Sequence, residues 1–125
     1  MQRLAKIVTM TPDKFRRLAL GLQGVSEQEH MSHPDFRVGS KIFATLGYPD
    51  ENWGMVKLTS EQQQSFVAKA PETFRPCKGR WGDQGATNVQ LETAKVTVVS
   101  AALEAAWRNI AAPQKVDPTT RRDRS

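Results

Sequence analysis

The sequence feature that most constrains the fold is the stretch from His30 to Leu46, which has the pattern of a β-hairpin. Two apolar, strand-like arms flank Gly39-Ser40, and glycine at the first central position supplies the positive φ of a two-residue type II′ turn. This turn predicts that Val38 pairs with Lys41 and Phe36 with Phe43. Alternation then predicts two apolar faces, one of Phe36, Val38 and Phe43 and the other of Ile42, Ala44 and Leu46. We therefore expect cover on more than one side of the sheet.

Helix and strand signals alternate along the rest of the chain. Thr11-Pro12-Asp13 has the cap hydroxyl, the first-turn proline and the acid of a helix start. Ser60 and Gln63 have capping-box spacing and open a second helix, which Pro71 ends. The other predicted elements are a marginal strand at 25–32, strands at 53–58 and 87–91, a short strand beginning at 74, a glycine-rich loop at 76–86 and a final helix at 93–111. For the β-branched residues 95–99, a strand leading into a shorter helix is the alternative.

Length and charge limit the number of domains and the class of partner. The chain has 125 residues, a net charge of +5 and a pI near 9.7, which fits one domain. Residues 1–10 and residues 113–125 each contribute +2, so only +1 remains for the body between them. We predict an N-terminal extension at 1–10, a domain at 11–112 and a disordered basic tail at 113–125. Basicity of the whole chain is thus weak support for a nucleic-acid partner.

Cysteine usage and hydropathy bear on the compartment. The chain has one cysteine, Cys77, so it cannot form an intrachain disulfide, and a reducing compartment is the simpler interpretation. No apolar run approaches the ~20 residues that span a bilayer, and the N-terminus has no signal-peptide core. We expect a cytoplasmic protein without a membrane partner.

The residues that carry catalytic chemistry are sparse. His30, His33, Asp35 and Cys77 are too few and too widely spaced for the ligand pattern of a zinc site. A Cys-His nucleophile pair would need an orienting group that the sequence does not show. The glycines of 78–85 lack the Gly-Lys-Ser/Thr ending of a phosphate loop. We therefore expect no enzyme, no metal and no cofactor.

Basic and aromatic residues gather in two predicted protrusions. The glycine-rich loop and its start carry Arg75, Lys78, Arg80 and Trp81, and the hairpin tip carries Arg37 and Lys41. Basic side chains can bracket phosphates, and an exposed indole can stack on a base. The alternative for Trp81 is an anchor that folds the loop onto the core.

Several separated blocks of the chain resemble the MmcQ/YjbR family over about residues 10–112. They are His33-Pro34-Asp35-Phe36-Arg37-Val38, Ile42-Phe43-Ala44-Thr45-Leu46, Gly54-Met55-Val56-Lys57-Leu58, Trp81-Gly82 and Gly85-Ala86-Thr87-Asn88-Val89-Gln90-Leu91. The resemblance implies an α+β fold of two layers, with helices packed on an antiparallel sheet in the order α-β(3)-α-β(2)-α. The same order follows from the residue patterns above.

The resemblance also implies a DNA-binding protein of the double-wing type, with double-stranded DNA as the expected partner. The wings would be the turn at 37–41 and the loop at 78–85, which gives Arg37, Lys41, Arg75, Lys78, Arg80 and Trp81 as the nucleic-acid-binding residues. The alternative is a protein-interaction or chaperone-like module, because the same fold serves secretion chaperones. We expect a monomer or a weak dimer.

Overall fold

The structure is a computed structural model that describes residues 10–30 and 32–111. The expected extension, apart from Met10, and the expected basic tail from 113 onward lie outside the described residues. Met10 itself is buried, and its N–H donates to the carbonyl oxygen of Ala94 at 3.3 Å. The ordered body therefore includes Met10.

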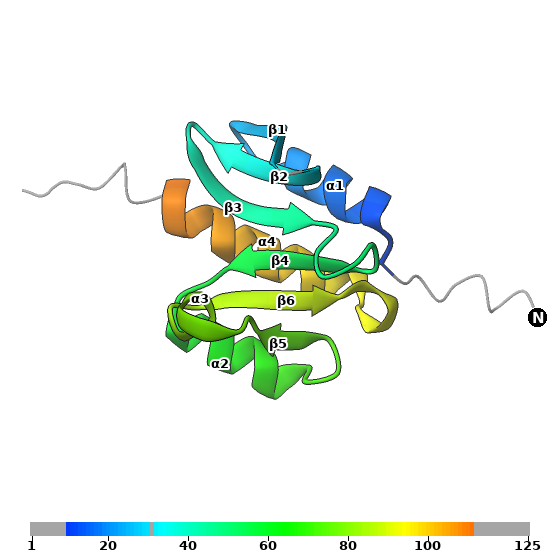
Figure 1. Cartoon of the computed structure of the whole chain (residues 1–125), viewed down its shortest axis with the longest axis vertical. Coiled ribbons are helices and arrows are strands. Elements are labelled where there is room, and N and C mark those ends of the chain that lie inside the picture. The colour runs from blue at the N-terminus through cyan, green and yellow to red at the C-terminus, as the bar shows by residue number, and fades with distance from the viewer. Residues whose placement is uncertain (1–9, 31, 112–125) are drawn as a thin grey trace, which may run out of the picture.

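The strands in the described part of the chain form one antiparallel sheet (Figure 1). Its strand order is β1-β2-β3-β4-β6-β5. The strands are β1 (Val25–His30), β2 (His33–Val38), β3 (Lys41–Leu46), β4 (Trp53–Lys57), β5 (Phe74–Pro76) and β6 (Ala86–Gln90). The helices are α1 (Pro12–Leu20), α2 (Ser60–Lys69), α3 (Gly79–Asp83) and α4 (Val96–Ala111), with a 3₁₀ turn, η2 (Leu91–Thr93), before α4. The predicted α+β class is confirmed.

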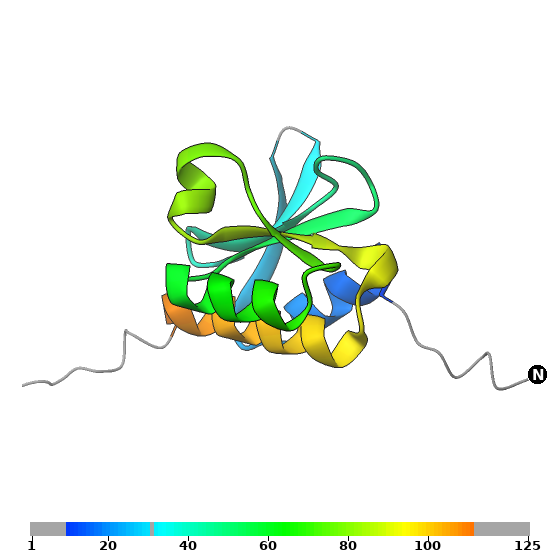
Figure 2. The same cartoon turned by 90° about the horizontal axis from the view of Figure 1, so that it is seen from below.

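The helices divide unequally between the two faces of the sheet. Figure 2 shows α1, α2 and α4 together on one face, which makes the second layer, and the short helix α3 on the other. The buried core lies between the sheet and this helical layer and includes Phe15 of α1 and Leu103 of α4. The packing is close enough that a Cβ on Gly54 would lie 2.9 Å from the Phe15 ring. The opposite face, called here the open face, is left without a helical layer.

A β-bulge changes the predicted register of the central hairpin. Val38 pairs with Lys41 as predicted, but Phe36 pairs with Ala44, not with Phe43. One step along β2 therefore matches two steps along β3, which leaves Phe43 as an extra residue. Phe43 and Ala44 are both fully buried, whereas Ile42 and Thr45 are partly exposed. The predicted two apolar faces were wrong, because the bulge turns consecutive apolar residues toward one core.

Two other elements differ from the sequence prediction, and the predicted final helix is confirmed. The marginal strand is a complete edge strand, β1, paired to β2 along its whole length, so four strands precede α2. Residues 79–83 of the predicted loop form α3. The residues from Val96 onward are helical, so the alternative of a strand at 95–99 does not apply.

Candidate functional site

A trough runs along the open face of the sheet. Two adjoining cavities of about 340 and 370 Å³ share four lining residues, Thr45, Tyr48, Met55 and Trp81. Met55 is buried at 5% exposure, whereas Trp81 and Tyr48 are 58% and 64% exposed. In Figure 2, α3 lies on one side of the open face and the β3–β4 loop on the other. We call the space between Trp81 and Tyr48 the trough.

The Gln63 side chain and a close approach of Gly82 to Cys77 hold α3, and with it Trp81, against the sheet. The Gln63 side-chain amide of α2 donates to the carbonyl oxygens of Gly82 and Ala86, both at 3.0 Å, and to Thr87 Oγ1 at 3.2 Å. Gly82 lies so close to the preceding strand that a Cβ would come within 1.6 Å of the Cys77 carbonyl oxygen. The helix is thus anchored by a buried amide and a glycine contact, and the exposed Trp81 is not the anchor that the sequence offered as an alternative.

The two predicted residues of the hairpin differ in their surroundings. Arg37 Nε donates to Asp35 Oδ1 at 2.7 Å, and its Nη2 donates to Oδ2 at 3.1 Å. Asp35 is 1% exposed, so the guanidinium neutralises a buried carboxylate, and the hydrogen bond to Asp35 raises the pKa of Arg37. Lys41 is exposed beside the turn. Arg37 is therefore already engaged within the protein, and Lys41 faces solvent.

The predicted residues near α3 are exposed cations and an exposed indole. Arg75 of β5 lies over the Trp53 ring, with its guanidinium carbon 5.2 Å from the centroid. Lys78 immediately precedes α3 and makes no side-chain capping hydrogen bond, and Arg80 lies within the helix. Within the described residues, none of Arg75, Lys78 and Arg80 has a carboxylate in ion-pair range.

Lys57 joins this group, and the sequence analysis missed it. Its ammonium lies 5.4 Å from the centroid of the Trp81 ring. Alternation along the predicted strand at 53–58 could have placed Lys57 on the same face as Met55. The structure thus brings Lys57, Lys78 and Trp81 together in the lining of the trough. Arg80 belongs to α3 but lines neither cavity.

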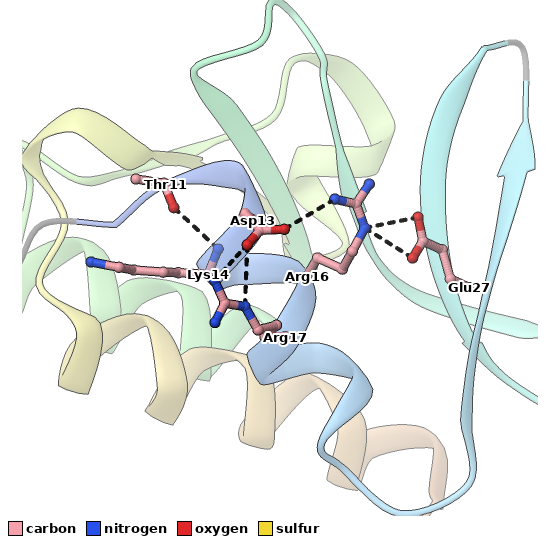
Figure 3. A network of polar contacts seen from close by, with 6 residues as sticks. All are labelled: Thr11, Asp13, Lys14, Arg16, Arg17 and Glu27. Atoms are coloured by element: carbon pink, nitrogen blue, oxygen red, sulfur yellow. Dashed lines mark hydrogen bonds and ion pairs between the residues drawn. The ribbon is translucent and has the colours of Figure 1, made fainter.

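In the helical layer, by contrast, the arginines are paired with carboxylates (Figure 3). Arg16 of α1 bonds Glu27 at 3.0 Å, and this hydrogen bond raises the pKa of Arg16. Arg17 pairs with Asp13 at 2.5 Å, and Arg108 of α4 pairs in the same way with Glu104. Of the six arginines in the described part of the chain, only Arg75 and Arg80 lack an acidic partner, and both lie toward the open-face side around α3.

His33 and Cys77 contact other residues and not each other within the described part of the chain. The His33 ring contacts the Tyr48 ring edge-on, with centroids 6.0 Å apart. Cys77 donates from Sγ to Asn88 Oδ1 at 3.2 Å, and burial raises its pKa to about 11, so the thiol is protonated near neutral pH. Across residues 10–30 and 32–111, no three His, Cys, Asp or Glu side chains gather into a group that could hold a metal ion.

The described helices include none whose length and apolar content would suit a membrane span.

The part of the chain that makes up the site is α3, β4, β5 and β6 with the loop that carries Tyr48. Chemically, it offers stacking surfaces, unpaired cations and an apolar floor. It offers no nucleophile activated by a base.

Comparison with known proteins places the chain in a family. In fold it is similar to the crystal structure of the Deinococcus radiodurans protein DR2400, described as a DUF419 domain, with a TM-score of 0.69, 15% sequence identity, and 87% of this chain and 84% of that chain covered. At that identity the likeness concerns the fold alone. No curated protein matches the chain in sequence. Residues 20–109, more than two thirds of the chain, match the family model described as YjbR, so the chain belongs to the YjbR family, as its sequence motifs predicted.

Proposed function

We propose that this protein binds DNA without catalysis, through phosphate contacts from the cations around α3. The observation that carries the proposal is the distribution of ion pairs among the described residues: the arginines of the helical layer are matched with carboxylates there, whereas Arg75 and Arg80 are not. An unpaired guanidinium can bind phosphate without first breaking an internal ion pair. Lys57 and Lys78 add two further unmatched charges beside them.

The hairpin tip has a smaller part in this proposal than the sequence suggested. Arg37 would have to leave a buried carboxylate to reach a phosphate, which is unfavourable. Lys41 has no such constraint, and the β2–β3 turn lies at the same end of the strands as α3 (Figure 1). Lys41 therefore stays a candidate phosphate contact at that end of the sheet, whereas Arg37 has a structural role.

The test is DNA affinity measured across a salt series by fluorescence anisotropy. Each phosphate contact contributes about −0.9 to the log–log salt slope on duplex DNA and about −0.7 on a single strand. The double variant Lys78→Ala/Arg80→Ala should therefore flatten the slope by about 1.8 or about 1.4, respectively. Its matched control is Lys69→Ala/Lys95→Ala, which removes the same charge from exposed positions in the helical layer and just before α4.

Two results would reject the proposal. Equal effects of the two double variants would mean that only net charge matters. Loss of all binding when Arg121, Arg122 and Arg124 are replaced by alanine in the full chain would assign binding to the C-terminal segment. The proposal expects that triple variant to weaken binding and to leave the effect of Lys78→Ala/Arg80→Ala intact.

A second candidate is a protein-interaction module, which the apolar floor of the trough favours. Met55, Ile42 and the two exposed rings could receive apolar side chains of a partner or of a second copy of the chain. This candidate predicts association that changes little with salt and is lost in Met55→Lys. Sedimentation of the protein alone, with and without that substitution, tests the second copy.

A further inference from the structure

Two of the exposed large side chains in the described part of the chain are aromatic, and both line the trough. Among the described residues, only Leu20, Tyr48 and Trp81 are large hydrophobic side chains with high exposure, and the two aromatic ones both line the same cavities. Neither the Trp81 indole N–H nor the Tyr48 hydroxyl has a hydrogen-bond partner within the described part of the chain. Two exposed aromatic rings that line the same hollow are suited to stack on a planar ligand.

Polar groups at the base of the trough are left with unused hydrogen-bonding capacity. Asn88 accepts from Cys77 through its side-chain oxygen, while its side-chain NH₂ donates to no described residue. The Thr45 hydroxyl, which lines both cavities, is likewise unpartnered among the residues described. An amide donor and a hydroxyl that can donate or accept are the groups that read the edge of a nucleobase.

The positive charges around the trough suit a ligand that has a flat, apolar centre and anionic groups at its periphery. Lys57 and Lys78 line it and have no carboxylate partner within the described residues. Asp35, the acidic residue of the lining, is 1% exposed and neutralised by Arg37. The lining therefore presents net positive charge at the positions where a sugar-phosphate chain would leave the trough.

We infer that the trough holds an unpaired base, so that the preferred ligand is single-stranded DNA, with Trp81 and Tyr48 as stacking residues and Asn88 and Thr45 as base-edge contacts. This inference rests on the proposed DNA binding and names its substrate class. Bases within a duplex are stacked on their neighbours and paired, so they cannot enter a trough walled by α3 and the β3–β4 loop. A single strand can splay one base into it while its phosphates reach Lys57 and Lys78.

The experiment compares a labelled single-stranded DNA, its duplex and the RNA of the same sequence at one salt concentration. We expect the single strand to bind the full chain more tightly than the duplex. Trp81→Ala should weaken single-strand binding about tenfold, since stacking on one aromatic side chain typically contributes that much or more. Trp81→Phe should retain most of the affinity, and Tyr48→Ala should reproduce part of the loss. Leu20→Ala, an exposed apolar control on α1, should change nothing, and circular dichroism checks that each variant is folded.

Each alternative outcome has a distinct meaning. If neither DNA form binds, the proposed function fails, and this inference fails with it. If the duplex binds as tightly as the single strand and Trp81→Ala has no effect, DNA binding stands but the inference is overturned. Tighter binding of the RNA would overturn the assignment to DNA. An apolar fluorescent dye that binds in the trough and is not displaced by the single strand would overturn the inference. The apolar floor of the trough would then favour a protein partner.

Discussion

Replacing Gln63 with alanine should loosen α3 and lower the stability of the whole protein. Gln63 is 8% exposed, and its NH₂ group makes three contacts to residues in and just after α3. No other side chain from the helical layer makes as many hydrogen bonds to this segment among the described residues. The side chain therefore connects α2, on one face of the sheet, to α3, on the other.

The structure sets the size of the effect. Two N–H groups serve the three acceptors, and each hydrogen bond contributes about 0.5–1.5 kcal/mol net, so we expect a loss of about 2 kcal/mol. The loss should not be much larger, because the carbonyl oxygens of Gly82 and Ala86 also accept from the backbone N–H groups of Gly85 and Cys77. The full penalty of an unsatisfied buried acceptor is thus avoided.

Urea unfolding of Gln63→Ala and of Gln64→Ala measures this difference. Gln64 is the next residue of α2 and is exposed, so its replacement should change the free energy of unfolding by less than about 0.5 kcal/mol. Hydrogen exchange gives a local readout, since the amide of Gln84, which bonds the Arg80 carbonyl oxygen at 3.0 Å, should exchange faster in Gln63→Ala. Equal stability of the two variants, with unchanged exchange at Gln84, would refute the role assigned to Gln63.

Three further predictions concern packing and charge. Gly82→Ala should destabilise the protein by about 2 kcal/mol or more, because its Cβ would overlap the Cys77 carbonyl; a wild-type urea midpoint would contradict the position of α3. Folding raises the pKa of Cys77 from 9.0 to about 11, so between these pH values the folded state keeps the thiol proton that the unfolded state has lost. The free energy of unfolding should therefore fall as pH rises from about 9 to 11. Urea midpoints measured at each pH should show this fall, and a smaller one in Cys77→Ser. Arg37→Ala should lower the thermal midpoint more than Arg17→Ala, because the former leaves the buried Asp35 carboxylate unpaired and the latter leaves an exposed one; equal shifts would mean that Asp35 is solvated.

Much of the fold could be predicted because its signals are local. The cap at Thr11 and the capping box at the start of α2 are both present, although the box is centred on Thr59 with Gln62, one residue before the pair named from the sequence. The turn at Gly39-Ser40 was placed correctly, since it depends on a single glycine with φ of +64°. Signals of this kind depend on a few neighbouring residues, and no tertiary contact is needed to interpret them.

The errors arose where distant contacts decide the local structure. The bulge at Phe43 lets two consecutive residues of β3, Phe43 and Ala44, lie in the same core. Strict alternation assigns consecutive residues to opposite faces, so it cannot predict this arrangement. Residues 79–83 contain glycines that favour a loop by propensity, yet one of them, Gly82, is there because the helix must approach Cys77 closely. Tertiary packing overrides propensity at both places.

The sequence named basic and aromatic residues for the candidate site but not how the fold arranges them. Lys78, Arg80 and Trp81 were proposed because they are close in sequence, and the structure shows that they are exposed. Lys57 and Tyr48 were not, because they join the site only when β4 and the β3–β4 loop are folded beside α3. The engagement of Arg37 by Asp35 follows from burial of the carboxylate, for which the sequence carries no signal.

The central claim is that DNA is bound on the open face of the sheet, and amide chemical-shift mapping tests it most directly. Titration of the isotope-labelled full chain with a single-stranded DNA should shift the amides of α3 and of the neighbouring parts of β3, β4 and β6, together with the indole N–H of Trp81. The amides of α1 and the exposed side of α4 should stay in place. Shifts centred on the helical layer, or confined to the chain ends outside residues 10–111, would contradict the account.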